Sequence, residues 1–367
     1  MKKICNRCVM DSDIPDIVFD KDGNCNYCND LLSTINDMRK ISMSRSQSEV
    51  EKFITKVKSD GKGKPYDCVI GVAGGVDSSW VLYKAKELGL RPLAVHMDNG
   101  WNSELAQSNI EGLISKLDVD LYTHIINWRE YKNLMQAFFD ADVVDVELLY
   151  DNAMWAVNYN IAKKFGIKWI LDGTNKATEG MRMPNGWNWF KYDAKNIKSI
   201  AKKHGISKFE SYPLIGVLKY VWFSQILKIK RFSFLDLLNY NKDESLEILA
   251  EFSGYKKYPY KHYESIFTRF YQGFILPNKF GIDKRKLHLS NLVVTGQMER
   301  TDAVIELERI PYPSISELNS DKRYFIKKME WSEQDLDDYM QRPAISHSTY
   351  LSELNLWKIL VEIKNRI

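Results

Sequence analysis

Strand-like and helical patterns alternate along the chain from residue 67 to residue 171, and this alternation restricts the fold more than any other feature. Short apolar runs predict four strands, and segments with apolar residues every three or four positions predict the helices between them. Such alternation is typical of an α/β fold with a doubly wound parallel sheet, which binds its ligands at the carboxyl ends of the strands. The predicted strands are 67–71, 93–97, 121–126 and 167–171, and the predicted helices are 77–89, 103–117, 128–140 and 146–165.

The sequence Val-Ala-Gly-Gly-Val-Asp-Ser-Ser at 72–79 lies between the first strand and the first helix. Glycine tolerates positive φ and lets the backbone approach a ligand, and the N–H groups at the start of a helix attract anions. The loop lacks the lysine and the glycine spacing of a nucleoside-triphosphatase P-loop, and it is not a dinucleotide fingerprint. We therefore expect a cradle for pyrophosphate, with an ordinary glycine turn as the alternative.

The loop resembles the SGGxDS signature of the ATP pyrophosphatase (PP-loop) superfamily, which includes GMP, NAD and asparagine synthetases. Those enzymes split ATP between its α and β phosphates. Ala73 departs from the signature, which has serine at this position, and the missing hydroxyl removes a hydrogen bond worth roughly 1 to 3 kcal/mol. The matching residues are Gly74, Gly75, Asp77, Ser78 and Ser79, with Val76 at the variable position.

Two further strand ends carry polar residues, at 96–101 and 172–175, and a loop rich in Gly, Met and Pro follows the second. The resemblance implies that the first strand end lies against adenosine and the second near the phosphates. A carboxylate in the loop would hold Mg²⁺, and an arginine would offset charge on the leaving group. The alternatives are a core histidine and solvated loop charges. The residues expected to bind ATP here are His96, Met97, Asp98, Gly173, Thr174, Asn175 and Glu179, with Arg182 near the substrate.

Four of the five cysteines occupy the first 28 residues as two Cys-x2-Cys pairs, Cys5 with Cys8 and Cys25 with Cys28. This is zinc-ribbon spacing, and a closed site of four thiolates leaves no open position for catalysis. We expect structural Zn²⁺ rather than two disulfides, because no secretion signal is evident. The fifth, Cys68, lies within a predicted strand. Since glutamine hydrolysis needs a cysteine nucleophile, ammonia for this chain would come from another subunit.

The 367 residues are enough for several domains, and the net charge of +4 gives no argument for nucleic-acid binding. No apolar run approaches the roughly 20 residues of a membrane span, and the amino terminus lacks a signal-peptide core, so we expect a cytoplasmic protein without membrane insertion. The predicted organisation is a zinc ribbon at 1–30, a helical linker at 31–64, a PP-loop domain at 65–205 and a mainly helical substrate or partner domain at 206–367.

A second cluster, at 271–290, interleaves basic residues with Gly, Pro and aromatic residues. Such a loop suits a phosphorylated ligand, whereas a solvated charged loop is the alternative. Lys279, Lys284 and Arg285 are the candidates for binding the diphosphate of a nucleotide-linked sugar.

The order of these features, from the four-cysteine knuckle to the block at 279–285, resembles the bacterial N-acetyl sugar amidotransferases over nearly the whole chain. That family makes acetamidino sugars for lipopolysaccharide (LPS) O-antigens and for the nonulosonic acids of flagellin. Its members work with a separate class I glutaminase subunit of the imidazole glycerol phosphate synthase type, often with a cyclase-like companion. The resemblance implies adenylation of the acetamido oxygen by ATP, followed by amination, with Ser78, Ser79 and Mg²⁺ bound by Asp77 absorbing charge on pyrophosphate.

Two other functions remain open at this stage. A tRNA-thiolating PP-loop enzyme also combines zinc knuckles with this loop, but commonly needs active-site cysteines, and the predicted core has only Cys68. A catalytically degenerate scaffold would explain Ala73, although Asp77, Ser78 and Ser79 are retained.

Overall fold

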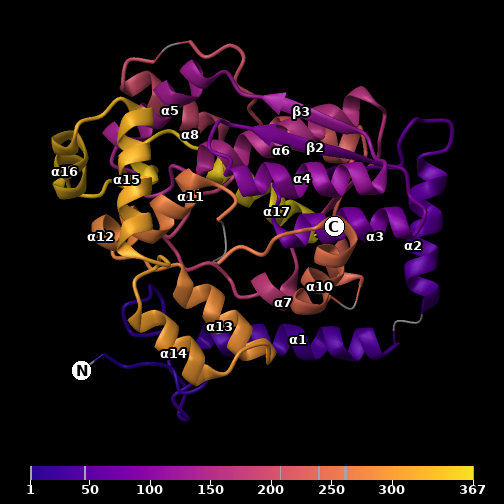
Figure 1. The fold of residues 1–367 in the computed structure, drawn as a ribbon, viewed down its shortest axis with the longest axis horizontal. Helices are drawn as coiled ribbons and strands as arrows, with labels where there is room; N and C mark the ends of the chain where they lie inside the picture. The colour runs from indigo at the N-terminus through magenta and orange to yellow at the C-terminus, as the bar shows by residue number, and fades with distance from the viewer. Residues whose placement is uncertain (1, 45–46, 207, 239, 260–262, 367) are drawn as a thin grey trace.

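The computed structural model describes residues 2–44, 47–206, 208–238, 240–259 and 263–366. Its centre is a sheet of five strands in the order β3-β2-β1-β4-β5 (Figure 1). All four pairs of neighbouring strands are parallel, so the α/β fold expected from the sequence is confirmed. The strands are β1 (Cys68–Gly71), β2 (Pro92–Asp98), β3 (Leu121–Ile125), β4 (Trp169–Asp172) and β5 (Lys230–Ser233).

Helices cover both faces of this sheet. Successive side chains of a strand point to opposite faces, so Ile70 packs in one apolar cluster with Val81 of α3 (Val76–Glu87). Val69 packs in a different cluster with Val157 of α6 (Leu148–Lys164). The four residues of β1 are therefore apolar throughout, because neither face of this central strand meets water.

The helices of the first half follow the predicted pattern within a few residues. In α5 (Trp128–Asp140), Asn127 caps the amino end by accepting a hydrogen bond from the Glu130 N–H, and Tyr131, Leu134 and Phe138 form the buried side. The other α-helices are α1 (Asn26–Ser44), α2 (Gln47–Asp60), α4 (Glu104–Leu117), α7 (Lys176–Glu179), α8 (Ala194–Lys203), α9 (Val217–Val221), α10 (Lys242–Ser253), α11 (Ile266–Phe270), α12 (Leu276–Phe280), α13 (Arg285–Thr295), α14 (Arg300–Glu308), α15 (Ile315–Met329), α16 (Glu333–Gln341) and α17 (Leu354–Arg366). Single π-helical turns follow α9 at Trp222–Ile226 and α11 at Tyr271–Ile275, and short 3-10 turns occur at Phe234–Asp236 and His347–Thr349.

The region after residue 205, expected to be mainly helical, also supplies a strand. β5 pairs with β4 at the edge of the sheet, with Ile170 opposite Arg231. Its sequence, Lys-Arg-Phe-Ser, lacks the apolar run that identifies the central strands, because an edge strand is only partly covered. Hydropathy therefore gave no signal for it.

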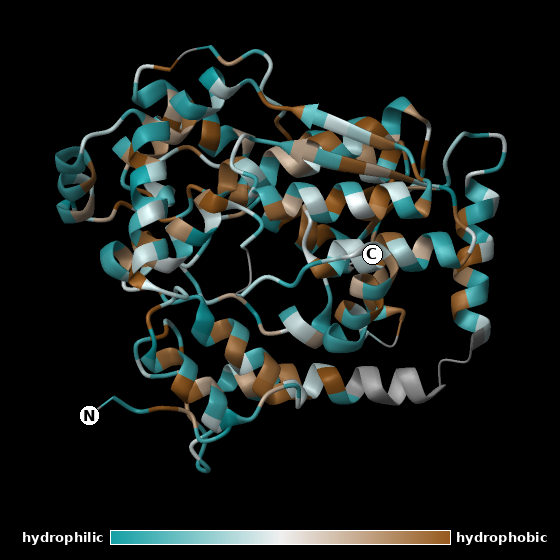
Figure 2. Ribbon diagram, in the orientation of Figure 1, coloured by the Kyte–Doolittle hydropathy of each residue, from teal (hydrophilic) through white to brown (hydrophobic). Residues whose placement is uncertain are grey.

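The amino-terminal segment lies beside carboxyl-terminal helices. Helix α13 packs against α1 at the lower side of the molecule, and α14 packs against α13 (Figure 1). Helix α16, at the periphery, is mainly hydrophilic (Figure 2). In the part of the chain that the structure describes, no helix combines the length and the apolar character needed to cross a membrane.

Candidate active site

The chain reverses its winding direction between β1 and β4. These strands are neighbours in the sheet, but the chain passes through β2 and β3 on one side before it returns to β4 on the other. Crevices at such a switch point are the usual ligand sites of open α/β sheets. The loop after β1 and the turn after β4 meet there, and a Cβ atom added to Gly173 would lie 2.9 Å from the Ser78 backbone nitrogen. Only glycine permits this approach.

The loop after β1 has the backbone geometry of an anion cradle. Gly74 has φ +83°, and a Cβ on it would lie 2.8 Å from the Ala106 carbonyl oxygen. Gly75 is the N-cap of α3 and Val76 its first residue, so the first N–H groups of a twelve-residue helix follow directly. The Ser78 hydroxyl donates to the Gly75 carbonyl at 3.2 Å.

A cavity of about 170 Å³, here called the small cavity, lies at this switch point. One wall carries the backbone of the two turns with Ser78 and Thr174, and the other, from β2, β4 and α6, is mainly apolar but includes Tyr150 and the buried Asn158, whose Oδ1 has no hydrogen-bond partner in the part of the chain that is described. Its size suits a nucleobase or a phosphate rather than a whole nucleotide. The lining residues are Gly71, Val72, Ala73, Ser78, Val95, Met97, Tyr150, Met154, Trp155, Val157, Asn158, Ile170, Asp172, Gly173 and Thr174.

Of the three residues proposed at the end of β2, only Met97 lines the small cavity. His96 is buried, and its Nε2 accepts from the Asn102 amide at 3.0 Å, which leaves Nδ1–H to donate to the Val72 carbonyl at 2.8 Å. This histidine therefore holds the start of the phosphate loop. Asp98 accepts from the Gly100 N–H at 2.8 Å and shapes the turn after the strand.

The turn after β4 is also held by its own side chains. Asp172 accepts from the Thr174 N–H at 2.9 Å and forms an ion pair with Arg231 of β5. Asn175 caps α7, with its Oδ1 accepting from the Thr178 N–H at 2.8 Å. Thr174 is thus fixed at the rim of the small cavity, whereas the side chain of Asn175 binds the backbone at the start of α7.

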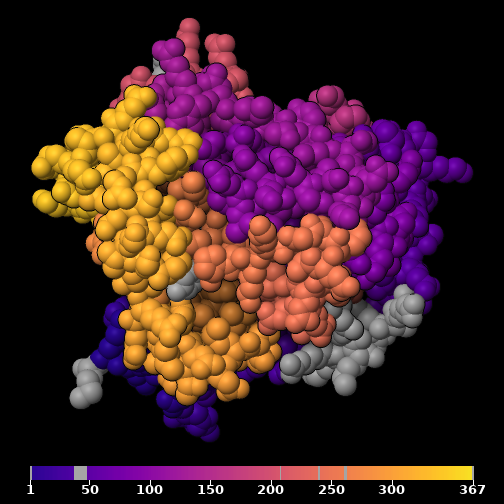
Figure 3. Space-filling model, in the orientation of Figure 1, coloured from indigo at the N-terminus to yellow at the C-terminus, as the bar shows by residue number. Residues whose placement is uncertain are grey.

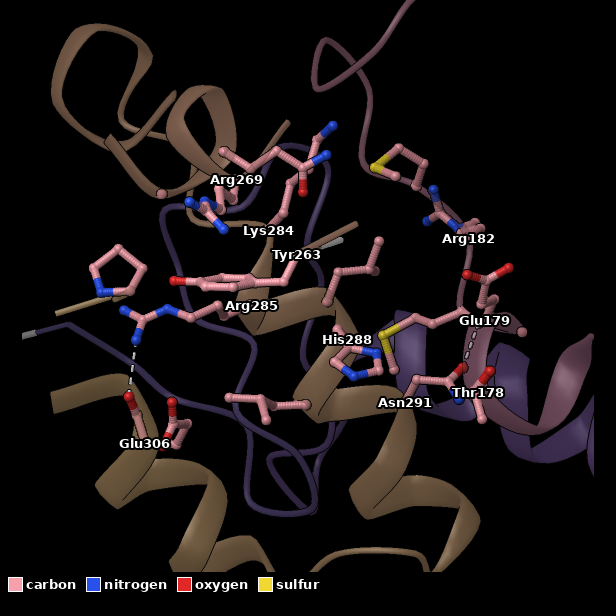
Figure 4. A pocket seen from close by; sticks show the side chains of 18 residues that line it. Thr178, Glu179, Arg182, Tyr263, Arg269, Lys284, Arg285, His288, Asn291 and Glu306 are labelled. Carbon is pink, nitrogen blue, oxygen red and sulfur yellow. Dashed lines mark hydrogen bonds between the residues drawn. The ribbon is translucent and has the colours of Figure 1, made fainter. Parts of the chain in front are cut away.

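A cavity of about 550 Å³, here called the large cavity, separates the segment after α7 from helices of the carboxyl-terminal region. Figure 4 shows Glu179 and Arg182 on one side and Lys284, Arg285 and His288 on the other. Its volume falls in the range of sites for drug-sized ligands. The lining residues are Thr178, Glu179, Gly180, Met181, Arg182, Met183, Tyr263, Arg269, Gln272, Gly273, Lys284, Arg285, Leu287, His288, Leu289, Asn291, Glu306 and Pro311.

Four cations line this cavity, and each is oriented by a carboxylate. Arg182 lies 3.3 Å from Asp30 and stacks over the Tyr27 ring at 4.1 Å. The remaining pairs are Lys284 with Glu147 at 2.9 Å, Arg285 with Asp283 at 2.8 Å, and Arg269 with Asp321. Arg182 and Arg269 keep further N–H groups for phosphate oxygens. Within the described chain, Arg285 keeps one, because its other four bind Asp283 and the Glu306 and Arg309 carbonyl oxygens. Sequence reasoning missed Arg269, because nothing in its local sequence marks it.

Lys279 does not belong to this set. Its side chain is 1% exposed, and its ammonium lies 3.0 Å from Asp142 and donates to the Tyr339 and Arg342 carbonyl oxygens. Three donors therefore already have three acceptors. The structure places Lys279 as a buried cation that joins α12 to the end of α16, away from any substrate.

Apart from the four cysteines of the predicted metal site, the residues predicted from the sequence divide into three groups. Ala73, Ser78, Met97, Gly173 and Thr174 line the small cavity, and Glu179, Arg182, Lys284 and Arg285 line the large one. Neither cavity is lined by Gly74, Gly75, Val76, Asp77, Ser79, His96, Asp98, Asn175 or Lys279.

The four amino-terminal cysteines converge on one point. Their sulfur atoms all lie within 4.8 Å of one another, and all four residues are buried. The Cys5 and Cys28 sulfurs are 3.7 Å apart, and those of Cys8 and Cys25 are 3.6 Å apart. Tetrahedral Zn²⁺ with sulfur at 2.3 Å requires about 3.8 Å between sulfurs, whereas a disulfide requires about 2 Å. The donor set therefore fits zinc in a closed, structural site.

This cysteine cluster is attached to the carboxyl-terminal helices. Arg300 of α14 donates to the Cys8 and Cys5 carbonyl oxygens at 3.1 and 3.0 Å, and the Val9 N–H donates to Ser290 of α13 at 3.2 Å. Helix α13 also lines the large cavity. Metal binding would thus support one wall of that cavity.

No curated protein matches the chain. Among solved structures, the chain is similar to NMN synthetase from Francisella tularensis, with 18% identity, TM-score 0.30 and coverage of 59% of this chain and 89% of that chain. It is also similar to the NH3-dependent NAD synthetase from Campylobacter jejuni, with 15% identity, TM-score 0.28 and coverage of 57% and 93%.

Residues 264–364 match the family described as LPS biosynthesis protein WbpG-like, C-terminal domain. These residues include Arg269, Lys284 and Arg285 of the large cavity and Arg300 at the cysteine cluster. Over these residues the chain is therefore similar to the C-terminal domain of WbpG-like LPS biosynthesis proteins, which supports the family expected from the sequence.

Proposed function

We propose that the chain is the synthetase component of an ATP-dependent amidotransferase that converts an N-acetyl group of a nucleotide-linked sugar into an acetamidino group. The acetamido oxygen attacks the α-phosphorus of ATP, and pyrophosphate leaves. Ammonia then adds to the activated carbon, and the C–O bond breaks to release AMP. Adenylation replaces a poor leaving group, the amide oxygen, with a good one.

The observation that carries this proposal is the continuity of the segment 172–183. Its first residues line the small cavity beside the phosphate loop, and Thr178 to Met183 line the large cavity. Thr174 and Thr178 are four residues apart, so their Cα atoms are separated by at most about 14 Å. ATP held at the phosphate loop and a sugar in the large cavity would thus meet along one short stretch of chain.

The chain's own groups match the charges of these reactants. The phosphate loop offers helix N–H groups and Ser78 to a pyrophosphate tail, as expected for stabilisation of a leaving group. Glu179 at the end of α7 lines the large cavity, and its carboxylate would hold Mg²⁺, which would neutralise phosphate charge. Arg182, Lys284 and Arg285 would bind the diphosphate of the sugar nucleotide.

Ammonia has to come from a partner in this scheme. Four of the five cysteines form the buried amino-terminal cluster, and Cys68 is fully buried within β1, where burial raises the pKa of its thiol. None of the five is available as a nucleophile for glutamine. We propose a class I glutaminase subunit as the source, with a cyclase-like subunit as a third component, and a cytoplasmic site of action.

The test is to incubate the chain with ATP, Mg²⁺, ammonium and a UDP-linked diacetamido sugar. We expect AMP and pyrophosphate in equal amounts, and a sugar in which mass spectrometry finds oxygen replaced by NH. Ser78→Ala should lower the rate roughly 10- to 100-fold, because it removes a hydrogen bond to a charged group. Ser108→Ala, on the exposed side of α4, is the matched control. Formation of ADP and orthophosphate, or AMP formation that depends on tRNA and not on the sugar, would refute the proposal.

A further inference from the structure

Three tyrosine hydroxyls from residues 240–258 reach the phosphate loop from outside both cavities. Tyr255 and Tyr258 both donate to the Gly74 carbonyl oxygen, at 2.9 and 3.0 Å. Tyr240 donates to the Asp77 carboxylate at the start of α3. None of the three tyrosines lines the small or the large cavity. In Figure 3 this segment, in salmon, covers the surface between the purple α3 and α4 and the orange carboxyl-terminal helices.

One side of α4 holds this segment against the loop. Ala106, Asn109 and Gly112 are three residues apart and so share a helix face. Ala106 contacts Gly74. Asn109 forms two hydrogen bonds with the backbone of Lys256 in the tyrosine segment 240–258: its amide donates to the carbonyl at 3.0 Å, and its Oδ1 accepts from the N–H at 2.9 Å. A Cβ on Gly112 would lie 2.9 Å from the Ser253 carbonyl, so the end of α10 packs directly on the helix.

The two hydrogen bonds to Gly74 fix the direction of a peptide group. A carbonyl oxygen has two lone pairs, and Tyr255 and Tyr258 occupy one each. In a trans peptide the C=O and the following N–H point in opposite directions. With the Gly74 carbonyl held toward the tyrosines, the Gly75 N–H points away from them, on the side where the loop enters α3.

We propose that Tyr255 and Tyr258 are positioning residues that orient the Gly74–Gly75 peptide so that the Gly75 N–H faces bound pyrophosphate. Burial raises the pKa of both phenols, so both remain protonated donors at neutral pH. Glycine at both positions leaves this peptide free to rotate in the absence of an external restraint. The tyrosine pair supplies that restraint. This inference rests on the proposed function, because it assumes that the loop binds pyrophosphate.

The experiment compares Tyr255→Phe, Tyr258→Phe and the double variant with Tyr83→Phe. Tyr83 is the matched control, because its ring stacks on Trp80 within the same helix and the substitution removes the same atom. Binding of inorganic pyrophosphate and of Mg·ATP is measured by calorimetry, and AMP formation gives KM and kcat. Each neutral hydrogen bond changes an equilibrium roughly two- to tenfold. We expect about tenfold weaker pyrophosphate binding in the double variant than in Tyr83→Phe, together with a lower melting temperature, because the buried Gly74 carbonyl loses both of its donors.

Hydrogen exchange of the peptide that contains residues 74–79 gives a second measurement, which also applies to the single variants if the double variant does not fold. Faster exchange of this peptide in both single variants, but not in Tyr83→Phe, is expected. Unchanged exchange with unchanged pyrophosphate affinity would overturn the inference. If the parent protein itself binds no pyrophosphate, the proposed function fails first, and the two failures are thereby distinguished.

Discussion

Protonation of His347 should determine a large part of the acid sensitivity of this protein. The ring is buried, its Nε2 accepts from the Asp145 N–H at 3.2 Å, and its Nδ1 faces the Asn196 side-chain oxygen at 2.8 Å. Trp189 stacks on it with ring centroids 5.1 Å apart. A second proton on Nε2 would have to displace the Asp145 N–H. Burial lowers the pKa of His347 from 6.5 to about 4.

The sign and size of the effect follow from proton linkage. Between pH 6.5 and pH 4 the unfolded chain carries a proton on residue 347 that the folded chain excludes, so the free energy of unfolding falls as the pH falls through this window. One pH unit inside the window corresponds to 1.36 kcal/mol, so lowering the pH from 6.5 to 5 costs about 2 kcal/mol.

The assay is urea unfolding of the parent and of His347→Gln at pH 7.5 and pH 5.0, with equal ionic strength and equal zinc. Glutamine can accept from the Asp145 N–H and donate to Asn196, but it does not titrate in this range. We expect the parent to lose about 2 kcal/mol more stability than the variant between the two pH values. Equal losses in both proteins would refute the reasoning.

Four further outcomes are expected. Cys25→Ser, or removal of zinc by a chelator, should lower the melting temperature and the affinity for the sugar nucleotide more than that for pyrophosphate; metal content and calorimetry check this. Gly173→Ala places a methyl group 2.9 Å from the Ser78 nitrogen and should abolish pyrophosphate binding. Gly186→Ala, where a Cβ meets nothing within 4 Å, should lower stability because of its φ of +80° but leave pyrophosphate binding unchanged. Lys284→Met should raise the KM for the sugar nucleotide about tenfold and leave the KM for ATP unchanged, as initial rates will show. Ala73→Ser should raise the rate of AMP formation roughly tenfold by restoring a hydrogen bond to phosphate; an unchanged rate would contradict this.

The sequence predicted the central sheet well, because β1, β2 and β4 are buried on both faces and therefore consist of apolar runs. It failed at β5, where an edge position permits Lys230 and Arg231. The loop rich in Gly, Met and Pro contains a short helix, α7, because Asn175 caps it. Asn175 is a typical N-cap residue, but no periodic apolar pattern follows it, so the sequence did not predict this helix.

The candidate site was predictable only where its residues are close together in the sequence. The phosphate loop and the turn at 172–175 follow strands, so the topology brings them together. Arg269, Tyr255 and Tyr258 reach the site from segments with no motif of their own, through tertiary contacts that local pattern does not encode. Lys279 has the right charge in the right cluster, but the fold turns it toward Asp142.

The stretch from Asp172 to Met183 belongs to the walls of both cavities, and this sharing has an energetic consequence. A ligand in the small cavity that shifts Gly173 and Thr174 also changes the positions of Glu179 and Arg182 in the large cavity. A ligand bound in either cavity should then change the affinity of the other cavity for its own ligand, and by the same factor in both directions. With positive coupling, each ligand would be retained longer once the other has bound.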